Sequence, residues 1–62
     1  MSSPAYNDRL TDVEARIIVE TERGWKLDDG KVQEWVPKSQ VENNGDGTFT
    51  MPEWLAVAKR FV

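Results

Sequence analysis

The chain has 62 residues, of which 39% are hydrophobic and 31% are charged, and its formal net charge is −3. This length holds one small domain, and the composition is too apolar for a wholly disordered chain. Cysteine and histidine are both absent, which excludes disulfide bonds, thiolate zinc sites and catalysis by a thiol or an imidazole.

Residues 1–12 are rich in Ser, Asn and Asp and contain few apolar anchors. We therefore expect them to form a flexible tail ahead of a single domain that covers residues 13–62. A second interpretation stays open, because Tyr6, Leu10 and Val13 are spaced as they would be on one face of a helix. In that case a helix would replace the tail.

A strand and a hairpin are predicted next. Every second residue from Val13 to Val19 is apolar, which is typical of a strand with one buried face. Asp29-Gly30 predicts a tight hairpin turn, because glycine accepts the positive φ that such turns need. The returning strand then covers 31–36 and stops at Pro37, which has no N–H to donate to a neighbouring strand.

The alternation in these strands divides the large side chains between two faces. We expect one face to pack in the core through Ile17, Val19, Trp25, Leu27, Val32 and Val36. Ile18 and Trp35 then fall on the opposite face, among basic and polar residues. Either a tightly coiled barrel buries both faces, or Ile18 and Trp35 mark a surface for self-association or for a ligand.

The second half of the chain predicts a loop, a strand and a helix in that order. Residues 42–47 consist of turn formers, and residues 48–51 have the β-branched and aromatic content of a short strand. A helix is expected over 52–61, with Thr50 and Glu53 as a capping pair. The apolar residues that would pack this helix onto the sheet are Trp54, Leu55, Ala58, Phe61 and Val62.

Together these elements predict an α+β fold. It would be a small antiparallel β-sheet, or an SH3-like barrel, of three to four strands with a C-terminal helix. The longest apolar run, Ile17-Ile18-Val19, is too short for a membrane span or a signal-peptide core. We therefore expect an intracellular protein that has no contact with a membrane.

Residues 42–53 can also be counted as a twelve-residue calcium loop followed by a helix. Its oxygen ligands would be Glu42, Asn44, Asp46 and Glu53. The first of these is glutamate rather than the usual aspartate, and Pro37 disrupts the helix that should enter such a loop. Because an ordinary hairpin tip needs the same Asn and Gly residues, the calcium site is kept as an alternative. Our primary prediction is that the chain uses no metal and no other cofactor.

Candidate catalytic groups are scarce. The hydroxyl of Ser39 has only the adjacent Lys38 as a base, and neighbouring side chains of an extended chain diverge. The carboxylates of Asp28-Asp29 precede Gly30 and are interpreted as turn residues. We therefore predict that the protein is not an enzyme.

The aromatic residues are better candidates for function. Trp35 lies near lysines in the sequence, and an exposed tryptophan beside a cation can stack on a base or a nucleotide. Ser39 and Gln40 would add hydrogen-bonding groups, although both can instead bind the backbone of a turn. The predicted ligand-binding residues are Trp35, Lys38, Ser39, Gln40 and Lys31.

Two short boxes carry a resemblance to other proteins. Trp35-Val36-Pro37-Lys38-Ser39-Gln40 and Pro52-Glu53-Trp54-Leu55-Ala56 resemble a family of short, mostly uncharacterised phage, prophage and bacterial proteins with a W-x-P-K-S-Q box followed by a P-E-W-L-A box. Asp29-Gly30 also matches, and the resemblance covers about residues 16–61. It implies a phage-related origin and a small β-rich domain, and it implies no activity. The end of this chain, Arg60-Phe61-Val62, departs from the Gly-Leu close of that family.

From these features we expect a non-enzymatic, phage-associated module that sequesters or blocks a partner in the cytoplasm of a bacterial host cell. The partner would be a nucleotide, a single-stranded nucleic acid or a host protein, and the net negative charge argues against double-stranded DNA. We also expect a homo-oligomer, because so small a domain has little core of its own. The alternatives are a calcium-binding loop protein and a structural accessory protein without a ligand.

Overall fold

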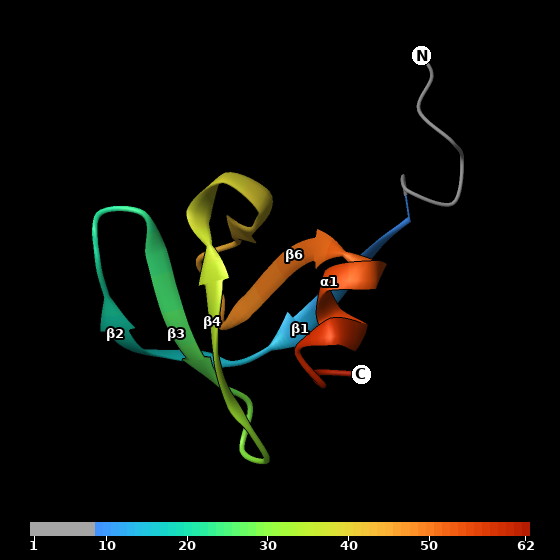
Figure 1. Cartoon of the computed structure of the whole chain (residues 1–62), viewed down its shortest axis with the longest axis horizontal. Coiled ribbons are helices and arrows are strands. Elements are labelled where there is room, and N and C mark those ends of the chain that lie inside the picture. Colours follow the sequence, from blue (N-terminus) through green and yellow to red (C-terminus); the bar gives the residue numbers. More distant parts are fainter. Residues whose placement is uncertain (1–8) are drawn as a thin grey trace.

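Two antiparallel sheets and a short helix form the fold in a computed structural model that describes residues 9–62 (Figure 1). The elements in chain order are β1 (Leu10–Glu14), β2 (Arg16–Glu20), β3 (Gly24–Asp28), β4 (Gln33–Pro37), the 3-10 helix η2 (Lys38–Gln40), β5 (Glu42–Asn43), β6 (Thr48–Pro52) and α1 (Glu53–Ala58). One three-stranded sheet has the order β1-β6-β5 and the other has the order β2-β3-β4. The β-rich fold with a C-terminal helix is confirmed, whereas the sheets are open and a closed barrel is not confirmed.

The first two strands belong to different sheets. β1 pairs with β6 and β2 pairs with β3, so the single strand predicted over 13–19 is wrong. The chain passes between the sheets at Ala15, whose N–H donates to the carbonyl of Gly47 at 3.1 Å. β1 begins at Leu10, so the tail boundary predicted at residue 12 lies too late, and a helix through this segment is also wrong. The rest of the predicted tail, with Tyr6, lies outside the described residues.

A β-bulge in β2 changes which side chains face the core. Ile17 is opposite Leu27 and Val19 is opposite Lys26, which leaves Ile18 as the extra residue. Val19 therefore shares a row with Lys26 and Trp35 on the outer face of the sheet, and it is 43% exposed. The prediction that Val19 packs in the core is wrong, because one inserted residue shifts the alternation of faces by one position.

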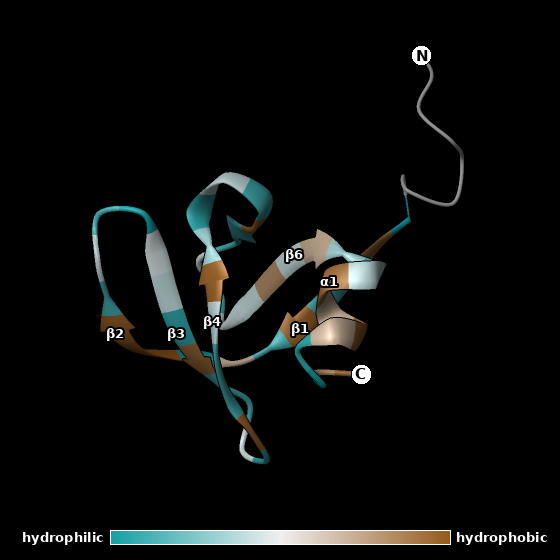
Figure 2. Cartoon of the chain, in the orientation of Figure 1, coloured by the Kyte–Doolittle hydropathy of each residue, from teal (hydrophilic) through white to brown (hydrophobic). Residues whose placement is uncertain are grey.

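The predicted turns are confirmed. Asp29-Gly30 lies in the turn between β3 and β4, and Gly30 has a φ of 95°. Residues 44–47 form the tip of a second hairpin, in which β5 pairs with β6, whereas Glu42 and Asn43 of the predicted loop belong to β5. Pro37 is the last residue of β4, as expected for a residue without a backbone donor. Figure 2 shows the turn between β2 and β3 as a hydrophilic segment.

The core lies between the two sheets and α1. Its buried residues come from both sheets, from the segment after η2 and from the carboxyl-terminal part; they are Val13, Leu27, Val36, Val41, Phe49, Met51, Leu55, Ala56 and Phe61. Within residues 9–62, no polar or charged residue is buried. The rings of Trp25 in β3 and Phe49 in β6 join the sheets, with 5.7 Å between their centroids. The fold therefore depends on apolar contact between the sheets.

The start of α1 is capped by backbone rather than by a side chain. Pro52 precedes the helix and makes no side-chain cap. The predicted capping pair of Thr50 and Glu53 is wrong, because the Thr50 hydroxyl donates to the Asp12 carboxylate at 2.6 Å. The N–H of Glu53 donates instead to the carbonyl of Arg9 at 2.9 Å. The residue just before β1 therefore satisfies the first free donor of the helix.

The helix is shorter than the predicted 52–61, and its apolar stripe is only partly buried. Leu55 and Phe61 belong to the core, together with Ala56. Trp54, Ala58 and Val62 are exposed. The prediction is wrong for these three because Leu55 and Ala56 form the buried side of α1, which leaves Trp54 and Ala58 on its exposed side, and because Val62 lies beyond the end of the helix at Ala58. No helix in the described part of the chain is long and apolar enough to cross a membrane.

The end of α1 has the two hydrogen bonds of a Schellman motif. The N–H of Phe61 donates to the carbonyl of Ala56 at 2.8 Å, and the N–H of Arg60 donates to the carbonyl of Val57 at 3.0 Å. Arg60 has a φ of 68°, the left-handed conformation that most such motifs assign to glycine. This turn sends Phe61 into the core at the cost of local strain.

We expect Arg60→Gly to raise the free energy of unfolding by about 1 kcal/mol, because glycine adopts the left-handed conformation without the clash of a Cβ. Urea denaturation followed by tryptophan fluorescence measures the change. Arg60→Ala is the matched control, since it removes the guanidinium and keeps the Cβ. Equal gains in the Gly and Ala variants would show that charge, and not backbone strain, limits stability here.

Candidate functional site

The outer face of the β2-β3-β4 sheet is the candidate site, and we call it the outer β2-β3-β4 face. Val19, Lys26 and Trp35 are opposite one another on the three strands and form one row across it. The adjacent row on the same face consists of Arg16, Asp28 and Gln33. No pocket opens anywhere in the described residues, this face included.

Trp35 has both a structural role and an exposed surface. A carbon of its ring lies 3.6 Å from the position that a Cβ on Gly24 would take. Gly24 is buried, which fits an aromatic ring that covers a glycine on the neighbouring strand and replaces its missing side-chain contacts. Even so, Trp35 remains 42% exposed. The ring is therefore held by the sheet and is still available to a partner.

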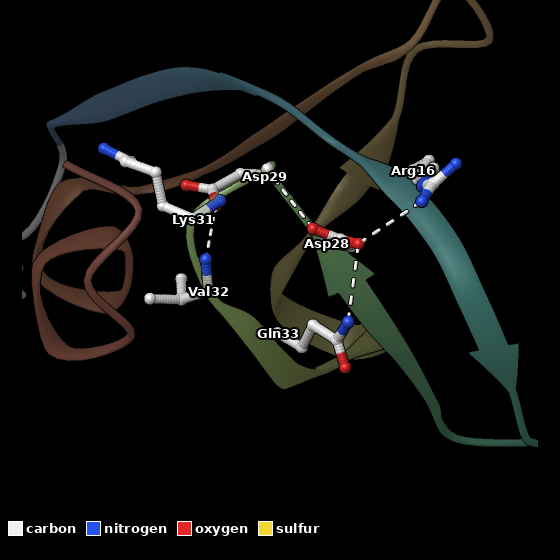
Figure 3. Close-up of polar contacts among 7 residues, drawn as sticks. Arg16, Asp28, Asp29, Lys31, Val32 and Gln33 are labelled. Atoms are coloured by element: carbon white, nitrogen blue, oxygen red, sulfur yellow. Dashed lines mark hydrogen bonds and ion pairs between the residues drawn. The ribbon is translucent and has the colours of Figure 1, made fainter.

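The charge of the outer β2-β3-β4 face is mainly basic. Lys26 lies in the middle of the row between the two apolar residues. The Asp28 carboxylate is already satisfied: it pairs with Arg16 at 3.5 Å, accepts from the amide of Gln33 at 3.5 Å and accepts from the N–H of Gly30 at 2.8 Å (Figure 3). The ammonium of Lys26 and the guanidinium of Arg16, whose side chain is 79% exposed, are therefore the positive charges on this face.

The outer face of the other sheet is acidic. Asp12 and Glu42 are both opposite Thr50, and Glu14 is opposite Thr48. Strands β1, β5 and β6 contain no lysine or arginine. The net charge of −3 is therefore unevenly distributed, with acidic residues on one sheet and a cation between apolar side chains on the other.

Lys38 lies away from Trp35. Its ammonium is 2.6 Å from the Glu20 carboxylate and 5.4 Å from the centre of the Trp25 ring. Glu20 and Trp25 are opposite each other on the inner face of the sheet, whereas Trp35 is on the outer face. The hydrogen bond from Lys38 and its positive charge lower the pKa of the Glu20 carboxyl. Lys38 therefore holds the turn after β4 against the sheet.

The other predicted ligand residues lie in turns. Lys31 is exposed in the β3–β4 turn, and Ser39 and Gln40 are exposed in η2. The structure thus does not bring the five predicted residues together on one surface. The sequence predicted that Trp35 lies among basic and polar residues, but it indicated neither Lys26 nor Val19 as a site residue. The β-bulge that moves Val19 outward leaves no local signal in the sequence.

The four residues of the alternative calcium loop have other partners. Asp46 accepts hydrogen bonds from the hydroxyl and the N–H of Thr48, which lower the pKa of its carboxyl. Glu53 pairs with Arg9 at 3.2 Å, at the start of α1. Asn44 donates to the hydroxyl of Thr48 at 3.0 Å, and Glu42 is in β5. Across residues 9–62, no three acidic side chains gather into a group able to hold a metal ion.

The β3–β4 turn is ordered by Asp29. Its carboxylate accepts hydrogen bonds from the N–H of Lys31 at 2.8 Å and from the N–H of Val32 at 2.9 Å (Figure 3). These bonds favour the ionised form, so they lower the pKa of Asp29, with the bond from Val32 as the largest cause. The β3–β4 turn sets the pairing register of these two strands, and this register places Trp35 beside Lys26.

Comparison with known proteins finds no family model, no curated protein and no solved structure that matches this chain. The resemblance of the two boxes to short phage and bacterial proteins therefore stays a prediction. In the structure, each box spans the end of a strand and the start of a helix: 35–40 joins β4 to η2, and 52–56 joins β6 to α1.

We expect Trp35→Ala to lower the free energy of unfolding by about 1–2 kcal/mol, since the ring is half exposed but covers Gly24. Trp25→Ala should cost about 3–5 kcal/mol, because it removes the ring that contacts Phe49 between the sheets. Chemical denaturation followed by far-UV circular dichroism compares the two variants. Losses of equal size would contradict the assignment of Trp35 to the outer face and of Trp25 to the inner face.

We expect Asp29→Asn to destabilise the protein at neutral pH and to make no difference in strong acid. A carboxyl whose pKa is lowered by folding stabilises the folded state above its unfolded pKa of about 3.9, and this contribution is lost as the pH falls through the folded pKa. Urea midpoints of the two proteins from pH 7 to pH 2 measure the difference. A gap that stays constant over this range would contradict the role of the ionised carboxylate.

Proposed function

We propose that the protein is a non-enzymatic binding module that blocks a partner protein through the outer β2-β3-β4 face. The observation that carries this proposal is the row formed by Val19, Lys26 and Trp35, which is apolar at both ends and cationic in the middle. Tryptophan is enriched among the residues that dominate the energy of protein interfaces. Here its ring is fixed over Gly24, so little conformational entropy would be lost on binding.

The lack of a pocket in the described part of the chain favours a macromolecule over a free nucleotide. Sites for small molecules are concave and surround most of the ligand, whereas the described residues form no pocket. A nucleotide would contact one side of the Trp35 ring and little else. A protein surface can instead cover the whole row and exclude water from the contact around Lys26.

The chemistry of the row indicates what the partner presents. Apolar groups would cover Trp35 and Val19, and a carboxylate would lie opposite Lys26. Asp28 does not take the place of that carboxylate beside Lys26. Its own carboxylate already binds Arg16, Gln33 and the N–H of Gly30. The resemblance of the two boxes supports a phage-related origin, and the partner that we propose is a host protein in the bacterial cytoplasm.

A single-stranded nucleic acid is the second candidate partner. It is favoured by an exposed aromatic ring next to a lysine, the arrangement on which bases stack while a phosphate meets the cation. The net charge of −3 and the single exposed ring on this face make it the weaker candidate.

We expect Lys26→Glu to abolish binding, because it reverses the charge in the middle of the row. Immobilised wild-type and variant chains are incubated with a bacterial lysate near physiological salt, and retained proteins are compared by quantitative mass spectrometry. Lys31→Glu is the matched control, since it makes the same charge reversal in the β3–β4 turn, outside the row. A purified protein retained by the wild type should bind Lys26→Glu at least about tenfold more weakly and Lys31→Glu unchanged.

A parallel titration with an oligothymidylate separates the two candidates. Quenching of tryptophan fluorescence that weakens with salt and disappears in Lys26→Glu would assign the face to single-stranded nucleic acid and overturn the protein partner. Retained proteins that bind the wild type and Lys26→Glu equally would show that the outer β2-β3-β4 face is not the binding surface.

A further inference from the structure

A second apolar surface lies at the other end of the molecule, on the exposed side of α1. Trp54 and Val57, one helical turn apart, are 51% and 56% exposed, and Ala58 beside them is also exposed. Leu10, which is 65% exposed, is opposite Pro52 directly before the helix. We call these four residues, Leu10, Trp54, Val57 and Ala58, the helix surface. Figure 1 shows α1 beside β1 and far from the β2–β3 turn.

Nothing in the described part of the chain accounts for the exposed ring of Trp54. Trp25 contacts Phe49 and Lys38, and Trp35 covers Gly24. Trp54 has no comparable aromatic or cationic contact among residues 9–62. A tryptophan that neither fills the core nor covers a strand is the side chain expected at the centre of an interface.

The charges around the helix surface are self-complementary. Its centre is uncharged, and Lys59 and Arg60 follow the last residue of α1. Glu53 is the first residue of α1 and stays partly exposed while it pairs with Arg9 at 3.2 Å. If two copies of α1 cross in antiparallel orientation near Val57, each Glu53 comes close to Lys59 and Arg60 of the other copy. A twofold axis requires this relation, in which each residue of one copy meets its complement on the other.

We propose that the helix surface binds a second copy of this chain and forms a twofold dimer. An interface of standard size buries about 800 Å² on each partner, which is about one fifth of the 4254 Å² that this structure exposes. Within residues 9–62, four of the seven exposed large hydrophobic residues lie in α1, at the start of β1 or at the carboxyl end of the chain. A small domain without disulfides also gains stability from association, because its own core is limited.

The outer β2-β3-β4 face does not suit this role. Lys26 lies in the middle of that face, so a twofold axis there would bring two ammonium groups together without a counter-ion. The two surfaces therefore bind different molecules. The helix surface binds a second copy of the chain, and the outer β2-β3-β4 face stays free to bind a different partner. The dimer does not depend on the proposed function, since it uses a different surface.

The test compares Val57→Glu with Val19→Glu in the full chain. Both variants replace an exposed valine by the same acidic residue, but only Val57 lies on the helix surface. Sedimentation velocity over a range of protein concentrations measures the dimer dissociation constant. We expect Val57→Glu to raise this constant more than about tenfold and Val19→Glu to leave it unchanged. The melting temperature should rise with concentration in the wild type and in Val19→Glu, and not in Val57→Glu.

Three results would overturn the proposal. The wild type could stay monomeric at all concentrations, with Trp54 open to a fluorescence quencher. It could stay monomeric while Trp54 is protected, which would mean that residues 1–8 of the same chain cover the helix surface. It could form a dimer that Val57→Glu leaves intact, which would place the interface elsewhere. Far-UV circular dichroism of both variants shows that a change in association is not a loss of folding.

Discussion

The contact between the Trp25 and Phe49 rings is the interaction on which the rest of the structure depends. Each ring belongs to a three-stranded sheet, and the apolar inner face of each sheet is removed from water only where the other sheet covers it. Stacking the inner faces removes both from water, and the helix residues Leu55 and Ala56 pack in the same core. The ammonium of Lys38 also lies over the ring of Trp25, so the same ring holds the turn after β4.

This arrangement explains why the outer β2-β3-β4 face is left exposed. Once Trp25 and Leu27 face the core, alternation along β3 places Lys26 outside, and the pairing with β4 places Trp35 beside it. The ring of Trp35 then packs over Gly24 on the neighbouring strand. The same tryptophan thus contributes a little to stability and offers half of its surface to a partner, a combination suited to a rigid binding surface.

The carboxyl end is joined to the fold mainly by backbone hydrogen bonds. The carbonyl of Arg9 caps the start of α1, and the Schellman bonds close its end with Arg60 in a left-handed conformation. Six residues are too few for a helix to persist in water without tertiary contacts. The helix therefore exists because Leu55, Ala56 and Phe61 are buried, and the consequence is that Trp54 and Val57 point to solvent on its other side.

The sequence by itself determined the elements whose signals are local. The Asp29-Gly30 turn, the loop before β6 and the end of β4 at Pro37 follow from the backbone preferences of single residues, and the inner positions of Trp25 and Leu27 follow from alternation. Only the tertiary structure decided the division at Ala15, the bulge at Ile18, the cap of α1 and the separation of Lys38 from Trp35. Each of these depends on which distant strand or side chain supplies the partner, and pairing between distant segments is set by the packing of the whole core rather than by neighbours in the chain.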